Sequence, residues 1–111
     1  VRSRSCGSTL AMSVEPHEND TIAGVGLRVT ACAIGQAAAV IFAQDSAGRN
    51  IKGLSRVRDQ IKDWLSGGKA LPDWNGIEQL SEAKHFPGRH EAILLPWSAA
   101  IEALSNDQSA S

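Results

Sequence analysis

The most constraining feature of the sequence is a change of hydrophobic period at Cys32. Before it, Val25, Leu27 and Val29 alternate with small or polar residues, which is the period of a β-strand. After it, apolar residues recur at the spacing of one helix face, namely Ile34, Ala37, Ala38, Ile41 and Phe42. A thiol between a strand and a helix N-terminus lies beside unpaired backbone N–H groups and the positive end of the helix dipole. This position favours the thiolate, the form that binds metals and attacks electrophiles.

The N-terminal third of the sequence predicts a pair of strands. Alternating apolar residues predict a strand over residues 9–14, a polar turn over 15–20, and a returning strand over 22–30. Residues 1–5 are short and polar, and we expect them to be irregular. These segments therefore predict an antiparallel hairpin.

The remaining sequence predicts helices. The first should end near Gly48, and Asn50 is the predicted N-cap of the second. A short helical piece is expected after Gly76. The last helix should begin within residues 92–95, because Pro96 is tolerated only in a first turn. The second helix presents one apolar face, made of Leu54, Val57, Ile61, Trp64 and Leu65.

Length and composition narrow the class of protein. The 111 residues predict one α+β domain over 1–111, in which helices pack on one face of a small antiparallel sheet, either a hairpin or three strands. The net charge of −1 and the dispersed basic residues argue against nucleic acid or an anionic membrane as partner. No apolar run approaches the roughly 18 residues that a membrane span needs. No signal peptide is visible, so we expect a cytoplasmic, reducing location in which the two cysteines are free or ligated.

The two cysteines are predicted to be neighbours in space. Cys6 leads into the first strand and Cys32 follows the second, and an antiparallel pairing brings these positions to the same end of the sheet. Three interpretations remain open: half of a thiolate site for zinc or iron, a disulfide, or two unrelated buried residues. A metal site needs further ligands. The loop before the last helix supplies His90 and Glu91, with His85 as a weaker candidate.

An ordered set of features runs from Cys6 to the last helix. Cys6-Gly7-Ser8 precedes the strand pair, Cys32 heads an alanine-rich helix, and Phe86-Pro87 precedes a helix that carries Trp97. This order resembles the U-type iron–sulfur cluster scaffolds, IscU, SufU and the N-terminal part of NifU, and the spacing is most similar to the SufU branch. The resemblance implies a non-enzymatic carrier that receives sulfur from a cysteine desulfurase, holds an iron–sulfur cluster or a zinc ion, and serves acceptor apo-proteins. It also implies a helix before the first cysteine, so we expect a truncated start at Val1.

The chain departs from that family pattern at two ligand positions. Ser8 stands where the family has an aspartate, and Ala92 aligns with the third family cysteine. The resemblance therefore implies a site formed by Cys6 and Cys32, with His90 as the third ligand or Glu91 in its place.

The sequence leaves three functions open. The leading one is a divergent scaffold for an iron–sulfur cluster or a metal ion. A metal-free module that docks a desulfurase or an acceptor protein is the main alternative. A sulfur relay, in which Cys32 alone accepts a persulfide, is the third.

Overall fold

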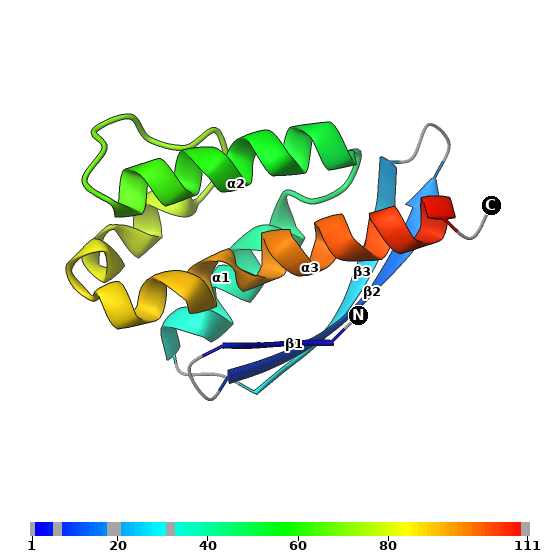
Figure 1. Cartoon of the computed structure of the whole chain (residues 1–111), viewed down its shortest axis with the longest axis horizontal. Helices are drawn as coiled ribbons and strands as arrows, with labels where there is room; N and C mark the ends of the chain where they lie inside the picture. Colours follow the sequence, from blue (N-terminus) through cyan, green and yellow to red (C-terminus); the bar gives the residue numbers. More distant parts are fainter. Residues whose placement is uncertain (1, 6–7, 18–20, 31–32, 110–111) are drawn as a thin grey trace.

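The computed structural model describes residues 2–5, 8–17, 21–30 and 33–109 as a small sheet followed by a group of helices (Figure 1). No helix in this part of the chain is long and apolar enough to cross a membrane. The elements in chain order are strands β1 (Arg2–Ser5), β2 (Ser8–His17) and β3 (Thr21–Thr30), helices α1 (Ala33–Gln44) and α2 (Ile51–Leu65), 3₁₀ helices η2 (Ile77–His85) and η3 (Pro87–Arg89), and helix α3 (His90–Ser109).

The sheet has three antiparallel strands in the order β1-β2-β3. Ser5 pairs with Ser8 across the first hairpin, and Thr9 pairs with Thr30 across the second. The irregular structure predicted for residues 1–5 is therefore wrong, because Arg2–Ser5 forms the edge strand β1. This strand is held by backbone hydrogen bonds to β2. The polar side chains of the segment show no alternation, so they could not have predicted this pairing.

Strand β2 also continues beyond its predicted end, through Glu15 and Pro16 to His17. The register shifts between Glu15 and Pro16, which is a β-bulge, and Pro16 then pairs with Ile22. The backbone N–H and C=O of Ile22 bond to the carbonyl of Arg49 (2.9 Å) and the N–H of Gly48 (2.7 Å), away from β2. Pro16 thus occupies a position where β3 requires no N–H, which explains how a proline is tolerated there.

The helices form two layers over the sheet. Helices α1 and α3 pack directly on one face of the strands, whereas α2 packs mainly against α3 and lies above it in Figure 1. The mixed α and β composition that the sequence predicts is confirmed. The prediction that the helices all pack on the sheet holds for α1 and α3 and is wrong for α2, whose partner is another helix.

Three aromatic rings meet at the centre of the helical layers. Phe42 of α1 stacks on Trp74, with ring centroids 5.4 Å apart, and Trp97 of α3 meets both rings edge to face at 5.4 and 5.3 Å. Trp97 is fully buried and Trp74 is 3% exposed. The interpretation of Trp74 as a packing residue is confirmed, and the trio joins α1, α3 and the loop before η2 into one core.

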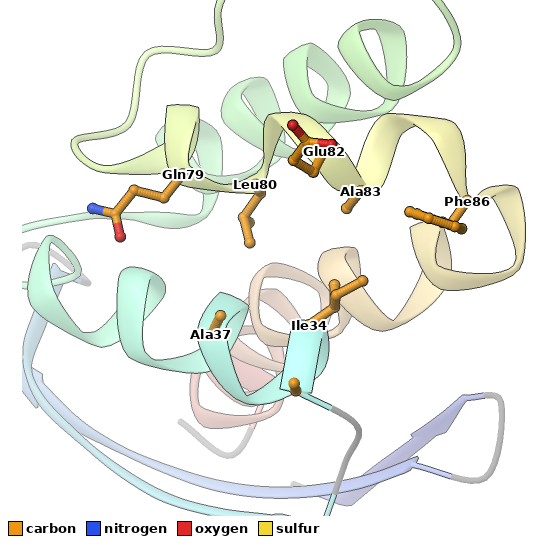
Figure 2. A pocket seen from close by; sticks show the side chains of 8 residues that line it. Ile34, Ala37, Gln79, Leu80, Glu82, Ala83 and Phe86 are labelled. Atoms are coloured by element: carbon orange, nitrogen blue, oxygen red, sulfur yellow. The ribbon is translucent and has the colours of Figure 1, made fainter.

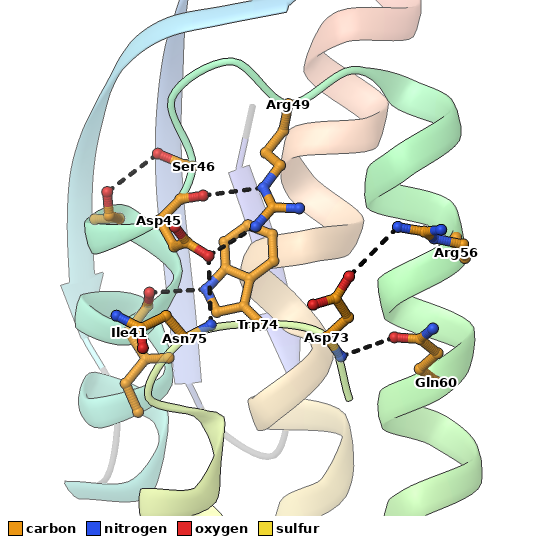
Figure 3. Close-up of polar contacts among 10 residues, drawn as sticks. Ile41, Asp45, Ser46, Arg49, Arg56, Gln60, Asp73, Trp74 and Asn75 are labelled. Carbon is orange, nitrogen blue, oxygen red and sulfur yellow. Dashed lines mark hydrogen bonds and ion pairs between the residues drawn. The ribbon is translucent and has the colours of Figure 1, made fainter. Parts of the chain in front are cut away.

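Polar contacts hold Trp74 in place (Figure 3). Its indole Nε1 donates to the carbonyl of Ile41 at 3.0 Å, and the guanidinium of Arg49 lies 4.4 Å from the centre of its ring. Arg49 also pairs with Asp45 at 2.7 Å, and the same carboxylate accepts the N–H of Asn75 at 3.3 Å. These contacts attach the loop around Trp74 to the C-terminal end of α1.

Helix α2 matches its prediction closely. The side chain of Asn50 accepts the N–H of Gly53 at 2.8 Å, as expected of an N-cap, and the helix ends at Leu65. The predicted apolar face is buried at every position, namely Leu54, Val57, Ile61, Trp64 and Leu65. Hydrophobic period and capping therefore suffice to define this element.

The start of the last helix differs from its prediction. Helix α3 begins at His90, and Pro96 lies inside it rather than in its first turn. A proline there removes the hydrogen bond to the carbonyl of Ala92. The ring of Pro96 is fully buried in the core, and this apolar burial accompanies the loss of that bond. The His90–Glu91 pair consequently belongs to the first turn of α3 rather than to the preceding loop.

Candidate functional site

The first component of the candidate site is the junction between β3 and α1. Strand β3 ends at Thr30 and α1 begins at Ala33, which confirms the predicted change from strand to helix. Cys32 itself lies outside the described residues. The first turn of α1 contains no acidic residue, so no carboxylate there opposes the positive end of the helix dipole.

The second component is the connection between β1 and β2. Cys6 also lies outside the described residues, but Ser5 and Ser8, which flank the connection, are paired across the first hairpin. The next residue, Thr9, pairs with Thr30 of β3. The chain therefore leaves β1, enters β2 and leaves β3 at one end of the sheet.

His90 is placed by a defined contact at the start of α3. Its side chain is half-buried, and Nε2 lies 3.2 Å from the carbonyl oxygen of Lys84. A carbonyl oxygen can only accept, so Nε2 carries the proton in this contact. In the neutral imidazole the lone pair is then on Nδ1, the usual arrangement of a metal-ligating histidine whose other nitrogen is hydrogen-bonded.

The other candidate ligands of this segment are arranged less favourably. Glu91 is exposed in the first turn of α3, and His85 is exposed at the end of η2. Ala92, the position aligned with the third family cysteine, is 3% exposed and packs inside the protein. Among these positions, only His90 combines partial burial with a hydrogen bond that orients its ring.

A shallow apolar depression lies next to the junction that contains Cys32 (Figure 2). Its volume is about 190 Å³, and it lies between the first turns of α1 and the segment from η2 to Phe86. Ala33, the residue after Cys32, is part of its wall, and Phe86 is 56% exposed at its rim. The wall is formed by Ala33, Ile34, Ala37, Gln79, Leu80, Glu82, Ala83 and Phe86.

This depression links the histidine to the first component of the site. His90 contacts the carbonyl of Lys84, and two residues near Lys84, Ala83 and Phe86, line the depression together with Ala33. The N-terminal ends of α1 and α3 lie at the same end of the molecule in Figure 1. Through Lys84, His90 is one contact away from the wall of this depression, and no group of three metal-ligating side chains occurs among the described residues.

Sequence reasoning missed the depression and its exposed ring. In the sequence, Phe86-Pro87 indicates only a family motif and a loop, yet Phe86 is one of the most exposed large apolar residues in the described part of the chain. Its neighbours Lys84, His85 and Arg89 are charged or polar, and an isolated apolar residue between such residues is the available signal of a surface contact.

Comparison with solved structures identifies the fold. A crystal structure of the N-terminal part of a nitrogen-fixing NifU-like protein from Brucella abortus superposes with a TM-score of 0.84 at 22% sequence identity. The likeness covers 100% of this chain and 78% of that one. The chain has a NifU-like fold. A second crystal structure, of a hypothetical protein, matches with a TM-score of 0.75 and 20% identity over 95% of this chain and 79% of the other. No protein-family model and no curated protein matches the sequence.

The NifU-like fold agrees with the resemblance read from the sequence at the level of architecture. At 22% identity it shows the arrangement of the elements and leaves the ligands to be tested, and it does not single out the SufU branch. Function therefore has to be argued from the residues that the fold brings to one end of the sheet.

Proposed function

We propose that this chain is a divergent iron–sulfur cluster assembly scaffold, a carrier rather than an enzyme, that holds its cargo through Cys6 and Cys32 with His90 as third ligand. The observation that carries the proposal is the strand register. Because Thr9 pairs with both Arg4 and Thr30, the β1–β2 connection that contains Cys6 and the segment after β3 that contains Cys32 adjoin the same end of the sheet. The NifU-like fold of the chain also supports the proposal of an iron–sulfur cargo.

The donor set suits soft metal ions. Two thiolates and an imidazole match the ligands that zinc and iron–sulfur clusters take, with one position left for a sulfide, a water or a donor from another protein. Ser8 and the buried Ala92 provide neither a carboxylate nor a thiolate at the other family positions. The proposed site is therefore open, which suits a cargo that must be passed on.

The proposed partners are a cysteine desulfurase, which would supply sulfur, and acceptor apo-proteins, which would receive the cluster. The depression beside the Cys32 junction is apolar and is bordered by the exposed ring of Phe86, so it can take an apolar side chain of such a partner. The free thiols that the proposal needs place its action in a reducing compartment, the cytoplasm.

The function is tested by cluster transfer. Purified protein is treated anaerobically with ferrous iron and sulfide, and the visible absorbance of a cluster is followed before and after addition of an apo-ferredoxin. We expect a chromophore that moves to the acceptor faster than from free iron and sulfide at the same concentrations. Absence of a chromophore, or transfer no faster than from the free ions, would overturn the proposal.

A metal-free docking module is the alternative, and Ser8 and Ala92 are the residues that favour it. In that case the chain would bind a desulfurase through the same surface without any cargo. Equal desulfurase affinity for the wild type and a Cys6→Ser/Cys32→Ser variant, together with no metal uptake by either, would support this alternative.

His90 has its own test. A His90→Ala variant is expected to bind cobalt(II), a spectroscopic stand-in for zinc, about a hundredfold more weakly, because one of three protein ligands is lost. The d–d absorption bands should shift as a nitrogen donor is replaced by water. His85→Ala is the matched control, since His85 is exposed and near the same segment, and it should retain wild-type affinity. Equal behaviour of the two variants would remove His90 from the site.

A further inference from the structure

The register of the sheet separates two faces of different character. Val25 packs against the core, so its position belongs to the inner face that α1 and α3 cover. The buried Ile22 joins the same face because the register shift between Glu15 and Pro16 adds one residue to β3 between them. Positions of β3 that alternate with Val25 belong to the opposite face, where Gly26 is exposed. In Figure 1 no helix lies beneath this opposite face, which we call the outer face.

Three arginine positions fall on the outer face at one end of the sheet. Arg2 pairs with Ala11, which pairs with Arg28, so these residues form one row across the strands. The next row towards the end of the sheet begins with Arg4 and continues through Thr9 and Thr30. Arg2 and Arg4 are close in the sequence, but only the fold adds Arg28 to them.

The outer-face rows contain no acidic residue at this end. The positions between the arginines are Thr9, Ala11 and Thr30, which are small. The nearest acidic position of the same face is Glu15, opposite Gly24, about 13 Å along β2 from Ala11. The register therefore groups three arginine positions on a protein whose net charge is −1.

The spacing of these positions suits carboxylates carried by an extended segment. Arg2 and Arg4 are about 7 Å apart along β1, and Arg2 and Arg28 are about 10 Å apart across two strand spacings. Alternate residues of an extended chain are also about 7 Å apart, so acidic residues at positions i and i+2 match the first pair. Three arginines neutralise at most about three phosphates, fewer than the roughly 6–10 contacts typical of strong duplex binding.

We propose that the arginine end of the outer face, formed by Arg2, Arg4 and Arg28, binds an acidic segment of a partner protein. The surface is distinct from the depression beside Ala33, which lies on the helical side of the sheet. It adjoins the end of the sheet from which the connections containing Cys6 and Cys32 start. A partner bound there would be held close to the cargo site without competing for the apolar depression.

The test uses the full chain and a fluorescent glutamate-rich peptide whose binding is followed by anisotropy. We expect an Arg2→Gln/Arg4→Gln/Arg28→Gln variant to bind the peptide at least about tenfold more weakly, since charge pairs at a protein surface contribute modestly one by one but add over three sites. The matched control is Lys52→Gln/Lys62→Gln/Lys69→Gln, which changes the net charge equally at exposed helix and loop positions. The control should bind within about twofold of the wild type.

Replacement of the three arginines by lysine should restore most of the peptide affinity, and added salt should weaken it. Zinc binding should be the same in all of these variants, so failure of this proposal is separable from failure of the cargo site. Equal loss in the glutamine variant and its control, or no peptide binding by the wild type, would overturn the proposal. Tighter binding of duplex DNA or of phosphatidylserine vesicles than of the peptide would overturn the assignment of a protein partner.

Discussion

Replacing Cys32 with serine is expected to lower the affinity for zinc by about a hundred- to a thousandfold. Structural zinc sites with four ligands bind with about 10–16 kcal/mol, so each ligand contributes about 2.5–4 kcal/mol on average, and a hydroxyl at neutral pH is a poor substitute for a thiolate. Competition with a chromophoric chelator measures the affinity directly. The same reasoning applies to Cys6, so the two single variants should show similar losses.

The control for this prediction is a serine that replaces no proposed ligand, and Ala92→Ser supplies it at a family ligand position. Its zinc affinity should remain that of the wild type if its folded state survives the small polar change in the core. The Ser8→Asp variant should have the opposite effect to the cysteine variants: it restores the family carboxylate and should tighten zinc binding. Undiminished affinity in both cysteine variants would contradict the proposed site.

Replacing Trp97 with alanine is expected to destabilise the fold by about 3–5 kcal/mol, the range for a large aromatic residue lost from a packed core. Trp97 is fully buried and contacts the rings of Phe42 and Trp74 edge to face. Domains of this size are stable by about 5–15 kcal/mol, so this loss is a large share of the total. Urea denaturation followed by circular dichroism measures it.

Two phenylalanine variants separate the contribution of the indole hydrogen bond from that of ring packing. In the described part of the protein, Trp97 Nε1 is buried without a hydrogen-bond partner, whereas Trp74 Nε1 donates to the carbonyl of Ile41. Trp74→Phe loses a hydrogen bond that Trp97→Phe does not, so it should cost about 1 kcal/mol more. A larger cost for Trp97→Phe than for Trp74→Phe would contradict this prediction.

The sequence predicted a helix correctly where hydrophobic period and capping were not opposed by tertiary packing. Asn50 and the apolar face of α2 required only helix period and a cap, and both agree with the structure. Pro96 shows the limit of such rules. Its ring is buried in the core, so tertiary packing overrides the local preference and α3 begins at His90.

The sheet was harder to predict because its pairing is not local. Arg2–Ser5 has no apolar alternation, and its strand structure comes from hydrogen bonds to β2. Pro16 predicted a turn, yet the bulge beside Glu15 places it where β3 needs no N–H. The grouping of Arg28 with Arg2 and Arg4 depends on the same pairing. For this reason the sequence showed Arg2 and Arg4 near each other among otherwise mostly dispersed basic residues and did not place Arg28 beside them.

The surroundings of the candidate site were predicted in part. The junction after Thr30 and the shared end of the sheet followed from period changes and antiparallel pairing, whereas His90, expected in the loop before the last helix, lies in its first turn. The depression beside Ala33 could not be predicted, because its wall combines α1 with η2, and no pattern within either segment specifies how the two pack. Cys6 and Cys32 remain predictions, since both lie outside the described residues.

The zinc X-ray absorption spectrum of the metal-loaded protein tests the central claim most directly. If Cys6 and Cys32 share one ion, the first shell contains two sulfur atoms at about 2.3 Å and nitrogen or oxygen atoms at about 2.0–2.1 Å. His90 should add the outer-shell scattering of an imidazole ring, and this should disappear in His90→Ala. A first shell with no sulfur, or with one sulfur that survives in the Cys6→Ser variant, would contradict a site shared by the two thiols.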